Sequence, residues 1–252
     1  MIDLLARAQR GFLTQLAWSE ILLAFDYDGT LAPIVPNRDE AEMRPHTARL
    51  FKLLCSTYPC AVLSGRSRSD VSARLGGAPV KYVVGNHGLE PDGDLPAFES
   101  QMLEARPRLE AALAPMQGVD LEDKRYSLAL HYRRAPNKHG ARAAIERAVQ
   151  SLPTPLRVVH GKLVVNVLPP RAPDKGTALL ALMEREGAAC ALYIGDDVTD
   201  EDVFRIGDPQ RLVTVRVVAS EDSAASHFIK SQLDIDALLA RFLELRRPEF
   251  VG

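Results

Sequence analysis

The chain has 252 residues, of which 46% are hydrophobic and 25% are charged, and its formal net charge is −2. This length allows one large domain or a core with a smaller insert, and the composition is ordinary for a soluble globular protein. The small net charge argues against nucleic acid or an anionic membrane surface as a partner. The sequence holds no apolar run long enough to span a bilayer, and its three cysteines lack metal-ligand spacing. We therefore expect a cytoplasmic protein with reduced thiols.

The first part of the chain alternates between helical and strand patterns. Short apolar runs predict buried parallel strands, and apolar residues at helical spacing predict the helices between them. The predicted strands lie at 21–25, 60–66 and 80–88, and the predicted helices at 1–20, 47–56 and 67–76. This order is typical of a parallel sheet covered by helices.

The pattern then changes and later returns. Helices are predicted at 98–115 and 140–152, a strand at 126–133, and two strands within 157–169 that are joined by a turn at His160–Gly161. Strands separated only by a turn indicate an antiparallel sheet. Beyond them, helices at 173–187 and 233–245 and strands at 190–197 and 211–218 resume the α/β order. We predict an α/β core formed by residues 1–88 and 170–252, interrupted by an inserted α+β unit at 89–169.

Polar residues collect where the predicted core strands end. In parallel sheets, ligands bind beyond the carboxyl ends of the strands, so these side chains are expected to lie near one another. They are Asp26 and Asp28 after the first strand, Ser64 after the second, Asp196, Asp197 and Asp200 after a late strand, and Lys175 at a helix start.

This set has the chemistry of a phosphoryl-transfer site. Carboxylates are hard oxygen ligands that suit Mg²⁺, whereas a lysine and a hydroxyl suit a phosphoryl group. Asp26 could attack phosphorus as a nucleophile, and Asp28 could protonate the leaving oxygen and later deprotonate water. Simpler readings stay open: Ser64 could cap the next helix, Lys175 could be a solvated surface lysine, and the late carboxylates could complement a helix dipole.

Four motifs in order resemble the haloacid dehalogenase superfamily. They are "DYDGTL" at 26–31, "LSGR" at 63–66, "DKG" at 174–176 and "GDDVTDED" at 195–202. Together with "VVGNHGLE" at 83–90 and "YSLALHYR" at 126–133, they resemble the trehalose-6-phosphate phosphatases in particular. The resemblance implies a Rossmann-like parallel core with an inserted α+β cap that closes over the sugar. It also implies Mg²⁺-dependent hydrolysis of trehalose 6-phosphate, a small-molecule sugar phosphate, through an aspartyl-phosphate intermediate.

The resemblance also assigns roles to the strand-end residues. Asp26 would be the nucleophile, Asp28 the general acid and base, and Ser64 and Lys175 would hold the phosphoryl group. The metal would be bound by the Asp26 carboxylate, the Asp28 backbone carbonyl and Asp196. Asp197 and Asp200 would bind it or orient nearby water.

The candidates for substrate binding are the polar residues of the junction and the insert. They are Arg66, His87, Glu90, Lys124, His131, Arg133, Lys162 and Asn166. Each cap residue could equally be structural, and Arg66 could instead pair with a core carboxylate. Asn166 stands where the family usually has a glutamate, and Leu168 where a basic residue is common. This departure leaves open a phosphatase of another glycosyl phosphate. A catalytically silent sugar-phosphate sensor is a further alternative of a different class.

Overall fold

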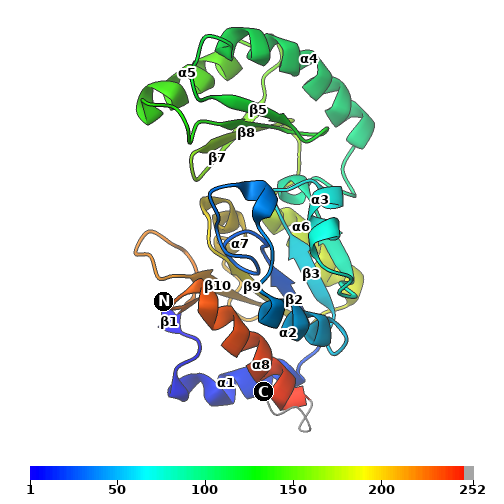
Figure 1. Ribbon diagram of the computed structural model, residues 1–252. Coiled ribbons are helices and arrows are strands. Elements are labelled where there is room, and N and C mark those ends of the chain that lie inside the picture. The colour runs from blue at the N-terminus through cyan, green and yellow to red at the C-terminus, as the bar shows by residue number, and fades with distance from the viewer. Residues whose placement is uncertain (247–252) are drawn as a thin grey trace. The chain divides into compact units, whose positions relative to one another are not determined.

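The computed structural model describes residues 1–246, which form two compact units (Figure 1). The first unit is Met1–Gly88 together with the chain from Lys175 onward, and the second is Leu89–Asp174. The second unit therefore extends beyond the predicted boundary at 169. The cause is local, because Ala172 packs in the same apolar cluster as Leu168, and Arg157 donates a 3.2 Å hydrogen bond to the carbonyl of Pro173. The predicted core also included 247–252, which lie outside the described residues.

The first unit is built on a seven-stranded sheet in which every neighbouring pair is parallel. The strand order is β1-β11-β10-β9-β2-β3-β4. The strands β3 and β4 follow on one side of β2, and the later strands β9, β10 and β11 follow on its other side. The strands are β1 (Ile2–Asp3), β2 (Ile21–Phe25), β3 (Cys60–Leu63), β4 (Tyr82–Val84), β9 (Cys190–Gly195), β10 (Leu212–Val217) and β11 (His227–Ile229).

Helices cover both faces of this sheet, which explains why its central strands are apolar throughout. One face packs against α1 (Arg10–Trp18), α2 (Pro45–Cys55), α3 (Arg68–Arg74) and α8 (Ile235–Arg246), and the other against α6 (Lys175–Glu186) and α7 (Glu201–Phe204). Along β2, Leu23 and Phe25 face the first set of helices and Leu22 and Ala24 the second. The parallel sheet covered by helices and the inserted α+β unit confirm the predicted fold class.

The second unit is a four-stranded antiparallel sheet with two helices on one side (Figure 1). Its elements are α4 (Leu95–Leu113), β5 (Asp120–Asp123), β6 (Leu128–His131), α5 (Lys138–Gln150), β7 (Arg157–Gly161) and β8 (Val164–Leu168), and the strand order is β5-β6-β8-β7. Leu128, Leu130, Val165 and Val167 share an apolar cluster with residues of both helices. Because strand residues alternate between faces, the intervening residues lie on the side without helices.

Three short strands were not predicted, and one turn was misplaced. β1 lies inside the segment predicted as a helix, and Leu4, directly after it, donates a backbone hydrogen bond to Phe228 of β11, a strand of three residues. β5 is an acidic edge strand that lacks an apolar pattern. The turn between β7 and β8 lies at Lys162–Leu163, not at His160–Gly161, because the latter two residues pair with Val165 and Val164.

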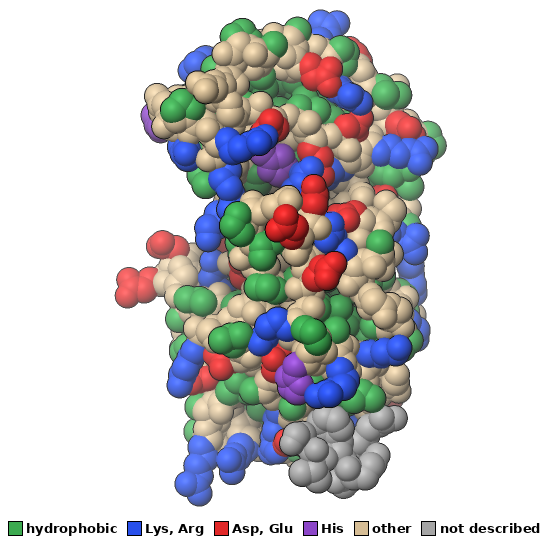
Figure 2. All heavy atoms as spheres, viewed as in Figure 1, with side chains coloured by type: hydrophobic (Ala, Val, Ile, Leu, Met, Phe, Trp, Pro, Cys, Tyr) green, Lys and Arg blue, Asp and Glu red, His purple; other side chains and the backbone are tan. Residues whose placement is uncertain are grey.

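Other sequence-based expectations concern the surface and the thiols. No helix within residues 1–246 is long and apolar enough to cross a membrane. All three cysteines are free, and two of them are buried. Figure 2 shows acidic and basic side chains mixed over the visible face, in keeping with the small net charge.

Leu23 tests the packing of the central strand. Its side chain is fully buried, so Leu23→Ala leaves a cavity and should lower the free energy of unfolding by about 3 kcal/mol. For a chain of this size we expect a fall in Tm of about 6–12 °C, measured by thermal melting. The matched control is Leu180→Ala on α6, where the side chain is 41% exposed and little change is expected. Equal shifts in both variants would contradict this account of the core.

Candidate functional site

The loop after β2 turns sharply and brings a second carboxylate close. Gly29 has a φ of 84°, and its N–H donates to the carbonyl of Ala32 at 2.7 Å, which closes the turn. A Cβ atom at Gly29 would run into the carboxylate of Asp196. Only glycine fits here, because it both accepts the positive φ and leaves room for Asp196.

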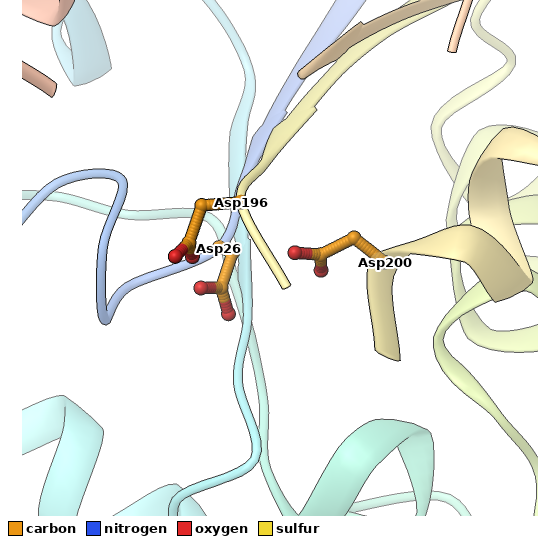
Figure 3. A group of neighbouring side chains, drawn as sticks. All are labelled: Asp26, Asp196 and Asp200. Atoms are coloured by element: carbon orange, nitrogen blue, oxygen red, sulfur yellow. The ribbon is translucent and has the colours of Figure 1, made fainter. Parts of the chain in front are cut away.

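Parallel pairing brings Asp26 and Asp196 together although they are far apart in sequence. Phe25 of β2 lies beside Ile194 of β9, and the N–H of Asp26 donates to the carbonyl of Ile194 at 2.8 Å. Asp200 reaches the same place from the short 3₁₀ turn Val198–Asp200. Figure 3 shows the three carboxylates directed toward one another, and one oxygen from each lies within 4.8 Å of the others.

Lys175, the first residue of α6, supplies a buried positive charge to this group. Its Nζ donates to Asp26 Oδ1 at 2.8 Å and to Asp200 Oδ1 at 2.7 Å, and its side chain is 1% exposed. Burial by itself would lower the pKa of Lys175, but the charges of Asp200 and Asp26 outweigh it and raise that pKa. The lysine is therefore charged and internal, which rules out the solvated surface role that the sequence left open.

One lysine does not neutralise three carboxylates. Burial raises the pKa of Asp26 well above its usual value, and the charges of Asp200 and Asp196 raise it further, whereas Lys175 lowers it. Burial together with the charges of Asp200 and Asp197 raises the pKa of Asp196 to about 7. If all three carboxylates were ionised, the site would hold an excess of negative charge in a poorly solvated position, which either protonation or a bound cation would relieve.

The donor set fits a divalent cation with oxygen ligands. Asp196 Oδ1 is buried and has no hydrogen-bond partner among the described residues. Asp26 and Asp196 can each direct a carboxylate oxygen to one ion, and hard oxygen donors suit such cations. The carboxylate of Asp197 and that of Asp28 do not belong to this group. The predicted metal ligand of Asp28 was its backbone carbonyl, which stays a prediction.

Asp200 is fixed by a residue that the sequence analysis missed. The hydroxyl of Tyr193 donates to Asp200 Oδ1 at 2.6 Å, and the N–H of Asp197 donates to Asp200 Oδ2 at 2.9 Å. Asp200 is fully buried, so these bonds and Lys175 hold its carboxylate in one orientation. A tyrosine inside an aliphatic strand was an available signal, because a buried hydroxyl needs a partner.

The carboxylate of Asp28 is held by Arg66, the last residue of the second motif. Arg66 Nε donates to Asp28 Oδ2 at 2.7 Å, and Nη2 donates to Oδ1 at 2.8 Å. Burial opposes the charge of Arg66, but its hydrogen bonds and charge interactions with Asp28 and Asp70 outweigh burial and raise the pKa of the guanidinium. Of the two roles that the sequence left open for Arg66, the ion pair with a core carboxylate is present.

Ser64 and His87 lie in two loops that are joined through the backbone. The N–H of His87 donates to the carbonyl of Ser64 at 3.0 Å, and the N–H of Asn86 donates to that of Arg66 at 2.7 Å. The side chain of Ser64 is buried and accepts from the N–H of Arg66 at 3.1 Å, whereas α3 is capped by Ser67. A role as the cap of α3 is thus excluded for Ser64. A Cβ at Gly65 would overlap the imidazole of His87.

The remaining substrate-binding candidates belong to the second unit. His131 Nε2 lies 2.9 Å from Glu122 on the neighbouring strand, and the side-chain amide of Asn166 donates to the carbonyl of Val159 at 3.3 Å. Lys162 is exposed in the β7–β8 turn. The other members of this set are Glu90 at the start of the unit, Lys124 between β5 and β6, and Arg133 just after β6. Substrate contacts by any of these residues stay predictions.

Comparisons with known proteins agree with the motifs. The family model described as trehalose-phosphatase matches residues 24–234. A trehalose-phosphate phosphatase of Mycobacterium bovis (strain BCG / Pasteur 1173P2) is 36% identical over 236 residues, covering 87% of this chain and 59% of the relative. One from Mycobacterium avium (strain 104) is 33% identical over 255 residues, covering 95% and 65%.

The chain thus spans about three fifths of the length of these relatives. Among solved structures, the C-terminal domain of a Candida albicans trehalose-6-phosphate phosphatase aligns with a TM-score of 0.75. It is 23% identical, with 94% of this chain and 96% of that chain covered, which shows a shared fold. Because the family model spans most of the sequence, the protein belongs to the trehalose-phosphatase family, as its motifs predicted.

Proposed function

We propose that the protein is a phosphoric monoester hydrolase that cleaves trehalose 6-phosphate to trehalose and phosphate. The observation that carries the proposal is the group of Asp26, Asp196 and Asp200, two of which bind the buried Lys175, in a chain of the trehalose-phosphatase family. A merely structural ion pair would not bring a third carboxylate beside the two that bind the lysine, because the unbalanced charge is unfavourable where water is scarce.

In the first step, a carboxylate oxygen of Asp26 attacks phosphorus and the bond from phosphorus to the sugar oxygen breaks. We assign the attack to Oδ2, because Lys175 already binds Oδ1 at 2.8 Å. Asp28 gives its proton to the departing sugar oxygen, so that trehalose leaves as a neutral alcohol. The covalent product is a phosphorylated Asp26. Lys175 and Ser64 hold the phosphoryl oxygens in this proposal.

In the second step, water attacks the phosphorus of phospho-Asp26 and passes a proton to Asp28. The bond from phosphorus to the Asp26 oxygen breaks, which releases phosphate and restores both aspartates. Asp200 and Tyr193 contribute by fixing Lys175 between the carboxylates, so that its charge stays in place through both steps. The cation that fits here is Mg²⁺, held by Asp26 and Asp196, and it would neutralise phosphoryl charge and keep the nucleophile ionised.

Recognition of the sugar is assigned to the helix-free face of the second unit. Glu122, Ala129, Asn166 and Val159 follow one another across the four strands in register, and His131 lies on the same face of β6. This face carries carboxylate, imidazole and amide groups, which can bind sugar hydroxyls. Asn166 offers an amide where a glutamate is usual, so it is the residue that most directly bears on which sugar is preferred.

A silent sensor is the less economical function for this chain. A silent relative would be expected to lack one of the residues that carry out the reaction. The chain keeps all of them: Asp26, Asp28, Lys175 and Asp196. Release of phosphate from trehalose 6-phosphate separates the two functions directly. A panel of other glycosyl phosphates, assayed in parallel, tests which substrate is preferred. If kcat/KM on another glycosyl phosphate were at least tenfold higher, that compound would replace trehalose 6-phosphate as the proposed substrate.

Asp26→Asn tests the nucleophile. An amide does not form the covalent intermediate, so phosphate release should fall by about three orders of magnitude or more. The fold should persist, because the substitution also removes one of three mutually repelling carboxylates, so we expect an unchanged or higher Tm. Asp222→Asn, at an exposed aspartate, is the matched control and should remain fully active. Substantial turnover by folded Asp26→Asn would remove this residue as the nucleophile.

The raised pKa of Asp196 predicts how metal and pH affect stability. A carboxyl group whose pKa is higher in the folded protein, here about 7, stabilises the fold at low pH and loses this contribution as pH rises through that value. In metal-free protein, Tm should therefore fall by about 5 °C between about pH 5 and pH 7.5, and Mg²⁺ should restore it at the higher pH.

The control for this experiment is Asp196→Asn, which cannot ionise. Its melting temperature should vary less with pH and should respond weakly to Mg²⁺. If wild-type protein and the variant gave the same pH profile and the same response to the ion, Asp196 would not be a ligand. Chelation should also stop phosphate release by the wild type.

Two lysines test whether the second unit selects the substrate. Loss of a hydrogen bond to a buried sugar hydroxyl costs about 1–3 kcal/mol, so Lys124→Ala and Lys162→Ala should lower kcat/KM on trehalose 6-phosphate by about 5- to 150-fold. Activity on 4-nitrophenyl phosphate, which lacks the sugar, should change by less than about twofold. Lys138→Ala on α5, across the sheet, is the control. Equal losses on both esters would show that these lysines do not recognise the sugar.

A further inference from the structure

We propose that Arg66 is a positioning residue that fixes the orientation of the Asp28 carboxylate for both proton transfers, an inference that rests on the proposed function. The two groups meet edge to edge, with hydrogen bonds of 2.7 and 2.8 Å that engage both carboxylate oxygens. Such bidentate contact fixes the plane of a carboxylate as well as its distance, which a single contact from lysine would not do.

Arg66 is itself held rigidly enough to act in this way. Its Nη1 donates to Asp70 at 2.7 Å, and its Nη2 also donates to the carbonyl of Arg38 at 2.6 Å. With the two bonds to Asp28, four of its five N–H groups are used. The guanidinium carbon lies 5.9 Å from the centroid of the buried Tyr27 ring, and only 9% of the side chain is exposed.

This environment favours a positioning role over direct substrate binding. A guanidinium that has one N–H group left has little capacity to bind a phosphate or sugar. Asp28, by contrast, is 35% exposed at its side chain, so it remains open to water or a leaving group while Arg66 holds its other edge. Each carboxylate oxygen keeps a second lone pair for proton transfer when the arginine occupies one.

Proton transfer depends strongly on geometry. Loss of the bidentate contact between Arg66 and Asp28, here called the clamp, should therefore slow the steps that need Asp28 and spare the others. Cleavage of phenyl phosphate needs a proton for its basic leaving group, whereas 4-nitrophenolate leaves readily without one. The two esters have almost the same shape and share the attack by Asp26. Their ratio of kcat/KM therefore measures proton donation by Asp28 separately from nucleophilic attack.

The experiment compares both esters with wild type, Arg66→Ala and Arg66→Lys. For Arg66→Ala we expect kcat/KM on phenyl phosphate to fall by about 100-fold and on 4-nitrophenyl phosphate by less than about fivefold. Because water activation also uses Asp28, the phosphorylated form of Asp26 should accumulate during turnover of 4-nitrophenyl phosphate. Acid quenching and intact-protein mass spectrometry should detect one added phosphoryl group. Arg66→Lys keeps the positive charge but loses the bidentate geometry, so its losses in kcat/KM should lie between those of wild type and Arg66→Ala.

The matched control is Arg74→Lys, in the same network. Arg74 donates to Asp70 at 2.8 Å and to the carbonyls of Asp39 and Ala41, so its loss perturbs the surrounding loop without removing the clamp. Its ester ratio should match that of the wild type. Millimolar guanidinium should restore turnover of phenyl phosphate by Arg66→Ala, which also shows that the variant is folded.

The positioning role is overturned if the folded Arg66 variants keep the wild-type ratio of kcat/KM on the two esters. If both values fall equally and guanidinium does not restore them, the arginine is merely structural. If the ratio is unchanged and no phosphoprotein accumulates, Asp28 works without the arginine. If the wild type released no phosphate from either ester or from trehalose 6-phosphate, the proposed function itself would fail, and the role of Arg66 with it.

Discussion

The buried contact of Lys175 with two aspartates is the interaction on which the rest of the site depends. An ammonium group inside a protein is tolerable only beside opposite charges that replace its lost hydration. Asp26 and Asp200 provide them at 2.8 and 2.7 Å, and Tyr193 shares the second carboxylate. Because Asp196 adds a third carboxylate, the single positive charge of Lys175 cannot balance all three when they are ionised. A site with this imbalance is suited to bind a cation, and its charge must be balanced anew when a phosphate dianion arrives.

Much of this arrangement could be predicted from sequence because it follows from strand geometry. Apolar runs that end in carboxylates place Asp26 and Asp196 at one edge of a parallel sheet, and the strands are where the pattern put them. The helix predicted at 173–187, with Lys175 near its start, is present as Lys175–Glu186. The functional roles given to these residues remain predictions, since geometry alone does not establish chemistry.

What escaped prediction depends on tertiary contacts. The short strands β1, β5 and β11 have too few residues to carry a periodic signal, and they exist because a neighbouring backbone is available. The choice between substrate and ion pair for Arg66 depends on where its side chain turns, which no local pattern encodes. Asp70 was overlooked for the same reason, although the spacing of Arg66 and Asp70 by four residues was compatible with a pair. Tyr193 did carry a signal, a hydroxyl inside an aliphatic strand, but its partner Asp200 is known only from the folded structure.

The order of strands also constrains how the chain can be made. β2 lies between β3 and β9, yet β9 starts at Cys190, after the whole second unit has been synthesised. Until then, one hydrogen-bonding edge of a fully apolar strand has no native neighbour. Such an edge can pair with other chains, and contacts over this sequence distance form slowly. Fragments that end before Cys190 should therefore be prone to aggregation, and the nascent protein has reason to depend on chaperones during its synthesis.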